Sequence, residues 1–194
     1  MNSQCMLFAD EPIALVRDAE GGIGYHPGVV ADDVAAAWFD ALLPSVPWRS
    51  EERPMYDRIV AVPRLMASVA LSDPSRPPCI DAALRAVCAV APAPYTRVGL
   101  NLYRGAGDSV AMHNDRVHGL APGQPIAILS LGAARDMLIR AKPGGPSRRV
   151  RLESGSVLVM SHASQHTHEH GIPKTSQPAG ARISVAFRVR LPCT

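Results

Sequence analysis

The stretch YTRVGLNLYRGAGDSVAMHND, residues 95–115, alternates apolar and polar side chains on both sides of a glycine-containing break. A period of two is typical of β-strands, so we expect strands over 97–104 and 109–115, joined by a turn at RGAGD. Short apolar runs broken by turn residues continue to the C-terminus and predict further strands at 125–131, 136–142, 148–152, 156–161, 165–170 and 181–190. This pattern indicates an α+β, mainly β fold, a double-stranded β-helix (jelly-roll) barrel.

The first part of the chain has a different pattern of apolar residues. Helical periodicity over 32–43 and 79–90 predicts two helices that flank the barrel, and 56–71 is expected to be extended. A length of 194 residues suffices for one domain with a substantial core. We expect a single domain over 1–194, with a helical and extended N-terminal part at 1–94 that includes the substrate-facing region and a jelly-roll core at 95–190.

The composition is that of a globular protein, with 47% hydrophobic and 19% charged residues. We expect no membrane partner and no signal peptide, because no apolar run approaches the roughly 18 residues of a span and no basic segment precedes an apolar one. The four cysteines lack metal-type spacing and are expected to be reduced thiols of a cytoplasmic protein. A net charge of +3 permits contact with nucleic acid without requiring it, and no protein partner is evident.

Two candidate metal ligands lie in the opening stretch. Residues i and i+2 of a strand point the same way, so His113 and Asp115 are expected on one face and Val110 on the other. A third ligand can come from SHASQHTHEHGIPK, which offers His162, His166, His168 and His170. Two nitrogens and one carboxylate make the facial triad typical of non-haem Fe(II). The residues alone leave the third ligand open, and ordinary polar residues at a strand edge are the alternative interpretation.

The C-terminal strand, in ARISVAFRVR, is expected to place Arg182 and Arg188 on one face and its large apolar side chains on the other. Two arginines inside a small barrel are costly unless an anion neutralises them. A dicarboxylate co-substrate would do so. Asn101 and Tyr103, together on one face of the first strand, would complete a polar pocket.

The ordered set N-x-Y, H-x-D, H-x-[IV]-P-K and R-x-x-x-x-x-R, within about residues 95–190, resembles the AlkB family of Fe(II)/2-oxoglutarate dioxygenases. The resemblance implies His170 as the third ligand beside His113 and Asp115, because it precedes GIPK. It also implies a 2-oxoglutarate pocket in which Arg182 holds the distal carboxylate. The remaining pocket residues would be Asn101, Tyr103, Ser184 and Arg188, with Ser184 where the family often has asparagine.

The resemblance implies an activity. Fe(II), 2-oxoglutarate and O2 would together yield succinate and CO2 and hydroxylate an N-methyl group of an alkylated base in DNA or RNA, which is then lost as formaldehyde. Two features depart from the family. Acidic base-reading residues after H-x-D are replaced by Arg116, Val117 and His118, and VPRLMASVALSDPSRPP lacks the aromatic lid. These leave open the same oxygenase chemistry on a modified RNA base, a small molecule or a protein side chain, and also a non-catalytic binding module.

A basic group lies between two of the expected strands and on them. It could follow a phosphate backbone or be a solvated hairpin, and consists of Arg135, Arg140, Lys142, Arg148, Arg149 and Arg151.

Overall fold

The computed structural model describes residues 11–55 and 58–191. Eight strands follow one another in the C-terminal half: β5 (Arg97–Tyr103), β6 (Val110–His113), β7 (Ile126–Gly132), β8 (Arg135–Ala141), β9 (Ser147–Leu152), β10 (Val157–Met160), β11 (His168–Ile172) and β12 (Arg182–Arg188). The N-terminal half contains β1 (Ile13–Val16), β2 (Ile23–His26), α1 (Asp32–Ser45), β3 (Arg49–Met55), β4 (Arg58–Ala70) and α2 (Cys79–Val90). A 3-10 turn, η1 (Val117–Gly119), and a short helix, α3 (Ser164–Thr167), complete the elements.

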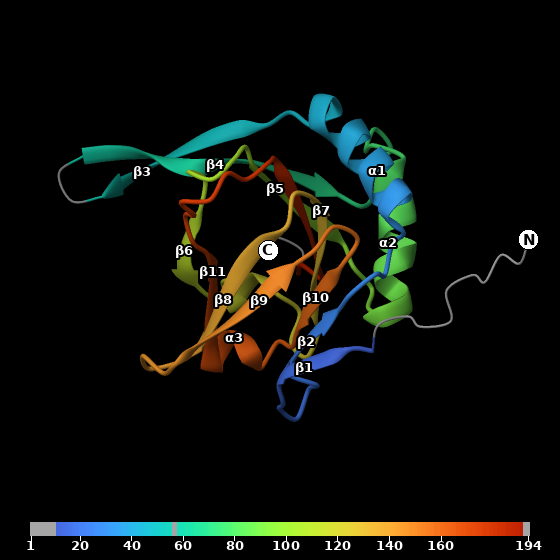
Figure 1. Ribbon diagram of the computed structural model, residues 1–194. Coiled ribbons are helices and arrows are strands. Elements are labelled where there is room, and N and C mark those ends of the chain that lie inside the picture. Colours follow the sequence, from blue (N-terminus) through green and yellow to red (C-terminus); the bar gives the residue numbers. More distant parts are fainter. Residues whose placement is uncertain (1–10, 56–57, 192–194) are drawn as a thin grey trace, which may run out of the picture.

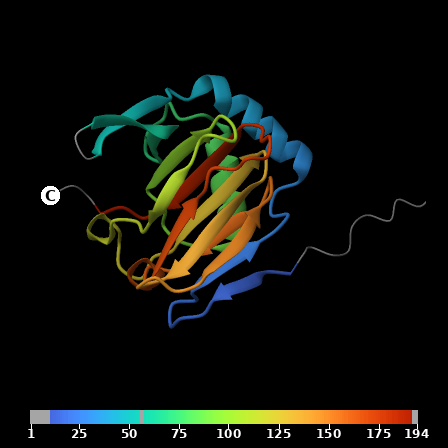
Figure 2. The ribbon, with the colours of Figure 1, turned by 60° about the vertical axis from the view of Figure 1, so that its left-hand side comes forward.

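Two antiparallel sheets face each other and form the jelly roll that the strand pattern predicts (Figure 1). The larger has the order β1-β2-β10-β7-β12-β5-β4-β3, and the smaller has the order β6-β11-β8-β9. Helices α1 and α2 lie together along the outer side of the larger sheet, as expected (Figure 1). Figure 2 shows the β1–β2 hairpin continuing this sheet at one edge, while the β3–β4 hairpin projects from the opposite end.

Two details of the elements differ from the sequence-based expectation, and a third agrees with it. The strand expected at 165–170 begins only at His168, because 164–167 form the turn α3. The strands β1, β2 and β3 were not anticipated in the N-terminal part, and each pairs with a neighbouring strand of the larger sheet. The extended segment expected at 56–71 is β4 from Arg58 onward, and residues 56–57 lie outside the described part of the chain.

Strand β12 separates two hydrophobic cores. Ile183, Val185 and Phe187 are fully buried in the core beneath the helices, whereas Ala186 belongs to the core between the sheets. Burial of each large apolar side chain contributes about 1.5–3 kcal/mol, so the alternation of RISVAFR determines which face of the strand turns outward to the helices. The opposite face, with Arg182 and Ser184, is thereby directed into the barrel.

Strand β6 carries an irregularity next to the candidate metal ligands. His113 pairs with His170 and Val110 pairs with Ile172, so three steps along β6 match two along β11. Such a bulge reverses the alternation of side chains, and the expectation that Val110 faces away from His113 is therefore wrong. Both residues line the interior of the barrel.

Candidate active site

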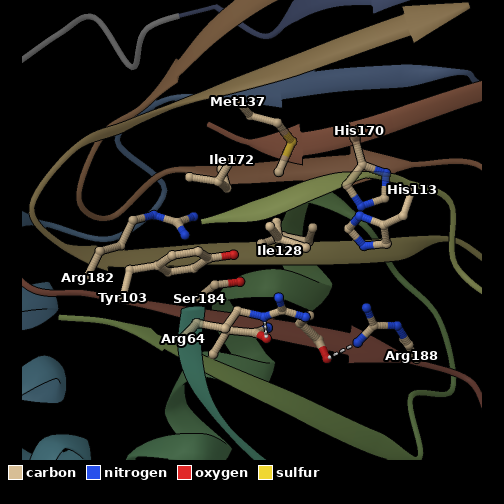
Figure 3. A pocket seen from close by; sticks show the side chains of 13 residues that line it. Arg64, Tyr103, His113, Ile128, Met137, His170, Ile172, Arg182, Ser184 and Arg188 are labelled. Carbon is tan, nitrogen blue, oxygen red and sulfur yellow. Dashed lines mark hydrogen bonds between the residues drawn. The ribbon is translucent and has the colours of Figure 1, made fainter. Parts of the chain in front are cut away.

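A cavity lies between the two sheets (Figure 3). Its polar wall comes from β5 and β12, its imidazoles come from β6 and β11, and its apolar wall consists of Ile128, Met137 and Ile172. Figure 3 shows Arg182 and Tyr103 at one end and the two imidazoles at the other. Of the residues expected in the site, the lining contains Asn101, Tyr103, His113, His170, Arg182, Ser184 and Arg188.

The pairing of β12 with β5 assembles the polar wall. Arg182 pairs with Tyr103, and Ser184 pairs with Asn101, so these alternating side chains meet on the inner face. The face that the sequence predicted for each pair is thus the one observed, although the pairing itself involves residues about 80 positions apart.

Arg182 is a fully buried cation without an anionic partner in the described residues. Its Nη2 donates to Ser130 Oγ at 2.9 Å, but Nε and Nη1 have no hydrogen-bond partner within 11–55 and 58–191. Its Cζ lies 5.4 Å from the centroid of the Tyr103 ring. Burial lowers the pKa of Arg182 to about 10, which leaves it charged at neutral pH. A buried charge with two unsatisfied donors is costly, and the wall is therefore built to receive an anion.

The imidazoles of His113 and His170 face each other across β6 and β11, with ring centroids 4.5 Å apart. Nδ1 of His113 lies 2.8 Å from the carbonyl oxygen of Ala111, which can only accept. In the neutral tautomer that nitrogen therefore carries the proton, and Nε2 has the lone pair. Burial, together with the neighbouring His113, lowers the pKa of His170 to about 3, so this imidazole is neutral and able to bind a metal.

Asp115 lies two residues beyond β6, and its carboxylate meets Arg188. Nε of Arg188 donates to Oδ2 of Asp115 at 2.6 Å, and both side chains are largely buried. Within the described ranges, no three His, Cys, Asp or Glu side chains are arranged as a ready metal cluster. The structure therefore brings the two imidazoles together and places Asp115 in electrostatic contact with both, with one carboxylate oxygen engaged by Arg188.

Arg64 of β4 is a further residue of the cavity. It is half-buried, lines the cavity, and donates from Nε to Oδ1 of Asn101 at 2.9 Å. Its position follows from the pairing of β4 with β5, in which Met66 stands opposite Asn101. The sequence carried only the weak signal of a charged residue inside an otherwise apolar strand.

The sequence also offered His162, His166 and His168 as possible third ligands, but none of them appears among the residues that line the cavity. His166 is exposed, and its ring packs edge-on to that of His162. His168 contacts Thr167 through Nδ1 at 2.9 Å. His170 is therefore the one histidine of this segment at the cavity.

The basic group of β8 and β9 is mostly engaged within the fold. Arg135 is buried and donates to three backbone carbonyls, so neither the phosphate-tracking nor the solvated interpretation holds for it. Arg140 pairs with Glu169, and both Arg149 and Arg151 pair with Asp136. The remaining two members donate to backbone or amide oxygens, Arg148 to Leu15 and Lys142 to Asn114 and Gln165.

The described helices include none that is both long and apolar enough to cross a membrane.

Segment 62–70, in the region where the sequence lacks the aromatic lid, belongs to β4, which pairs with β5 as far as Ala70. Arg116 and His118, in place of the family's acidic residues, are exposed.

Comparison with known proteins identifies the family of the chain. The chain is 35% identical over 102 residues to the DNA oxidative demethylase ALKBH2 of Homo sapiens, covering 48% of this chain and 39% of that protein. It is 28% identical over 193 residues to ALKBH2 of Arabidopsis thaliana, covering 79% and 62%. The alpha-ketoglutarate-dependent dioxygenase alkB homolog 3 of Homo sapiens is 33% identical over 101 residues, covering 47% and 35%. The chain thus spans less than two thirds of the length of these relatives, and the AlkB resemblance is confirmed.

The solved structure of OsALKBH1 superposes with a TM-score of 0.57 over 86% of this chain and 97% of the other, at 18% identity, which confirms the fold. The model of the 2OG-Fe(II) oxygenase superfamily matches residues 22–188. That family implies Fe(II), 2-oxoglutarate and O2 as cofactor and co-substrates. By its motifs, its barrel and this match over most of its length, the chain belongs to the 2OG-Fe(II) oxygenase superfamily.

Proposed function

We propose that this protein is an Fe(II)- and 2-oxoglutarate-dependent dioxygenase that oxidatively demethylates alkylated bases in DNA or RNA. The observation that carries the proposal is the buried guanidinium of Arg182, whose Nε and Nη1 lack partners among the described residues. A carboxylate accepts two parallel hydrogen bonds from one edge of a guanidinium, such as the edge formed by Nη1 and Nη2. It would neutralise the charge and give the unpaired Nη1 an acceptor at the same time.

The metal would be held by His113, His170 and Asp115. Neutral imidazoles and one carboxylate suit non-haem Fe(II), and the two rings already lie at the same end of the cavity. Arg188 occupies Oδ2 of Asp115, so Oδ1 would be the oxygen left to hold a metal. Arg188 thus orients the carboxylate.

The co-substrate would lie between these two ends. Arg182 and Tyr103 would bind its distal carboxylate, while Asn101, Ser184 and Arg188 line the wall toward the imidazoles. Ile128, Met137 and Ile172 form the apolar side of the cavity and limit access of water. When bound, the metal would supply the coordination sites at which 2-oxoglutarate and O2 react. The residues of this chain would bind and orient the metal and the co-substrate and keep water out of the cavity.

The nucleic-acid substrate is proposed from the relatives, two of which are named DNA oxidative demethylases. Arg116 and His118 are exposed directly after Asp115, where they could contact a phosphate or a base. We place this activity in the cytoplasm. The described cysteines, Cys79 and Cys88, are free thiols, as expected in a reducing compartment.

A second candidate is the same chemistry on a different substrate, such as a modified RNA base or a small molecule. The observation that favours it is that residues 62–70 form part of β4 and contain no aromatic side chain that could stack on a flipped base.

The test is a paired assay of anaerobically reconstituted Fe(II) protein with a panel of N-methylated DNA and RNA oligonucleotides. Succinate and formaldehyde produced together on one oligonucleotide would support demethylation and identify the substrate. Succinate without formaldehyde would leave the oxygenase and exclude the nucleic-acid part of the proposal. R182M should lose both products, whereas R85M, at an exposed position of α2 outside the cavity, should keep them.

A further inference from the structure

The backbone of Asp115 is held by a side chain from a distant element. Asp115 follows the end of β6, so no strand partner is available for its N–H. That N–H donates to Oε1 of Gln165 at 3.0 Å. Gln165 belongs to α3, the turn that leads directly into β11 and its His170.

The amide of Gln165 can adopt only one orientation. The residue is 2% exposed, and Nε2 donates to Oγ of Ser164, which in turn donates to the carbonyl oxygen of Ser161. A flipped amide would place a donor against the N–H of Asp115 and an acceptor against a hydroxyl already engaged as a donor. The acceptor oxygen is therefore held toward Asp115.

This turn is anchored at both ends. Oγ of Ser161 donates to Oδ2 of Asp18 in the β1–β2 turn at 2.6 Å. On the other side, Nζ of Lys142 donates to the carbonyl oxygen of Gln165 at 3.0 Å and to Oδ1 of Asn114 at 2.7 Å. Lys142 thus ties the residue before Asp115 to the same turn.

We infer that Gln165 is a positioning residue for the metal site. It joins the loop that carries Asp115 to the turn that precedes His170, so that the two ligands share one rigid support. The inference rests on the proposed function, since it presumes that Asp115 and His170 bind the metal. Groups that orient metal ligands commonly change metal affinity by about 10- to 100-fold when removed.

The experiment measures Co(II) binding to the full chain by titration calorimetry and by the visible spectrum of the bound ion, without oxoacid. Q165M, similar in length but without the acceptor, should weaken Co(II) binding by about 10-fold or more. Q165E keeps the acceptor oxygen but sets a second oxygen against Oγ of Ser164, and it should weaken binding less than Q165M does. K142M tests the second tie from a less buried position and should weaken binding by a smaller factor, about 3- to 10-fold.

Y95F is the matched control, because it removes one buried hydrogen bond, Tyr95 Oη to the carbonyl oxygen of Ala91, far from the cavity. It should leave Co(II) affinity unchanged, even if its apo unfolding temperature falls as far as that of Q165M. Wild-type affinity in folded Q165M, or an equal loss in Y95F, would overturn the inference. Failure of the wild type to bind Co(II) would instead remove the metal site and with it the proposed function.

Discussion

Arg188 of β12 donates from Nε to Oδ2 of Asp115 across 2.6 Å, although the two residues are 73 positions apart in the chain. Burial alone would raise the pKa of Asp115, but the charge and the hydrogen bond of Arg188 bring it below its ordinary value. The carboxylate at the imidazole end of the cavity is therefore ionised and already oriented before any ligand binds.

R188M should destabilise the metal-free protein by about 2–4 kcal/mol, because it leaves the Asp115 carboxylate buried without its cation. Added Co(II) should restore more stability to R188M than it adds to wild type, since the ion would then be the main positive charge next to that carboxylate. Urea unfolding with and without Co(II) measures both effects. Equal gains in the two proteins would contradict a metal at Asp115.

R182M, unlike R188M, should not destabilise the ligand-free protein. Without oxoacid its free energy of unfolding should be equal to or above that of wild type, because a buried cation with two unpaired donors is replaced by an apolar side chain. With 2-oxoglutarate at 100 times its dissociation constant and Mn(II) present, wild type should gain about 2.7 kcal/mol and R182M nothing. A gain in R182M would show that the oxoacid binds elsewhere.

G171A should force β6 and β11 apart. A Cβ at this position would lie 2.9 Å from the carbonyl oxygen of Val110 and 3.0 Å from the backbone nitrogen of Met112. We expect a loss of about 1–3 kcal/mol in unfolding free energy and weaker Co(II) binding, because His170 is the adjacent residue. The control is G107A, where a Cβ would meet nothing within 4 Å. Equal effects of the two substitutions would argue against close packing at the bulge.

D108N should show a pH-dependent loss of stability. Hydrogen bonds from Arg104 lower the pKa of Asp108 below its ordinary value of 3.8, so its charge stabilises the fold above that pH. At pH 7 D108N should be about 1 kcal/mol less stable than wild type. The difference should shrink as pH falls from 5 through the folded pKa, because wild type then loses the charge as well. Urea unfolding at several pH values would reveal a constant difference if the charge has no role.

The sequence predicted the jelly roll and both of its flanking helices, because strand and helix periods are local properties of the chain. It also predicted which face of β5 and β12 carries the polar residues. It did not predict the irregularity in β6 that turns Val110 to the side of His113, because a bulge arises from the pairing of two strands and leaves no mark on the alternation of one. Nor did it predict the burial of Arg135, whose acceptors are carbonyls of three separate segments.

The candidate site was likewise predictable from the sequence in part. The sequence gives the residue types, their order and the face of the strand on which each one lies. Together with the AlkB resemblance, these were enough to propose His113, Asp115, His170 and the two arginines as site residues. The tertiary structure decided which groups meet: Arg64 with Asn101, Arg188 with Asp115, and Gln165 with the backbone of Asp115. Each of these contacts joins residues at least 37 positions apart, and such a distance is closed only when the buried faces of the two sheets pack together.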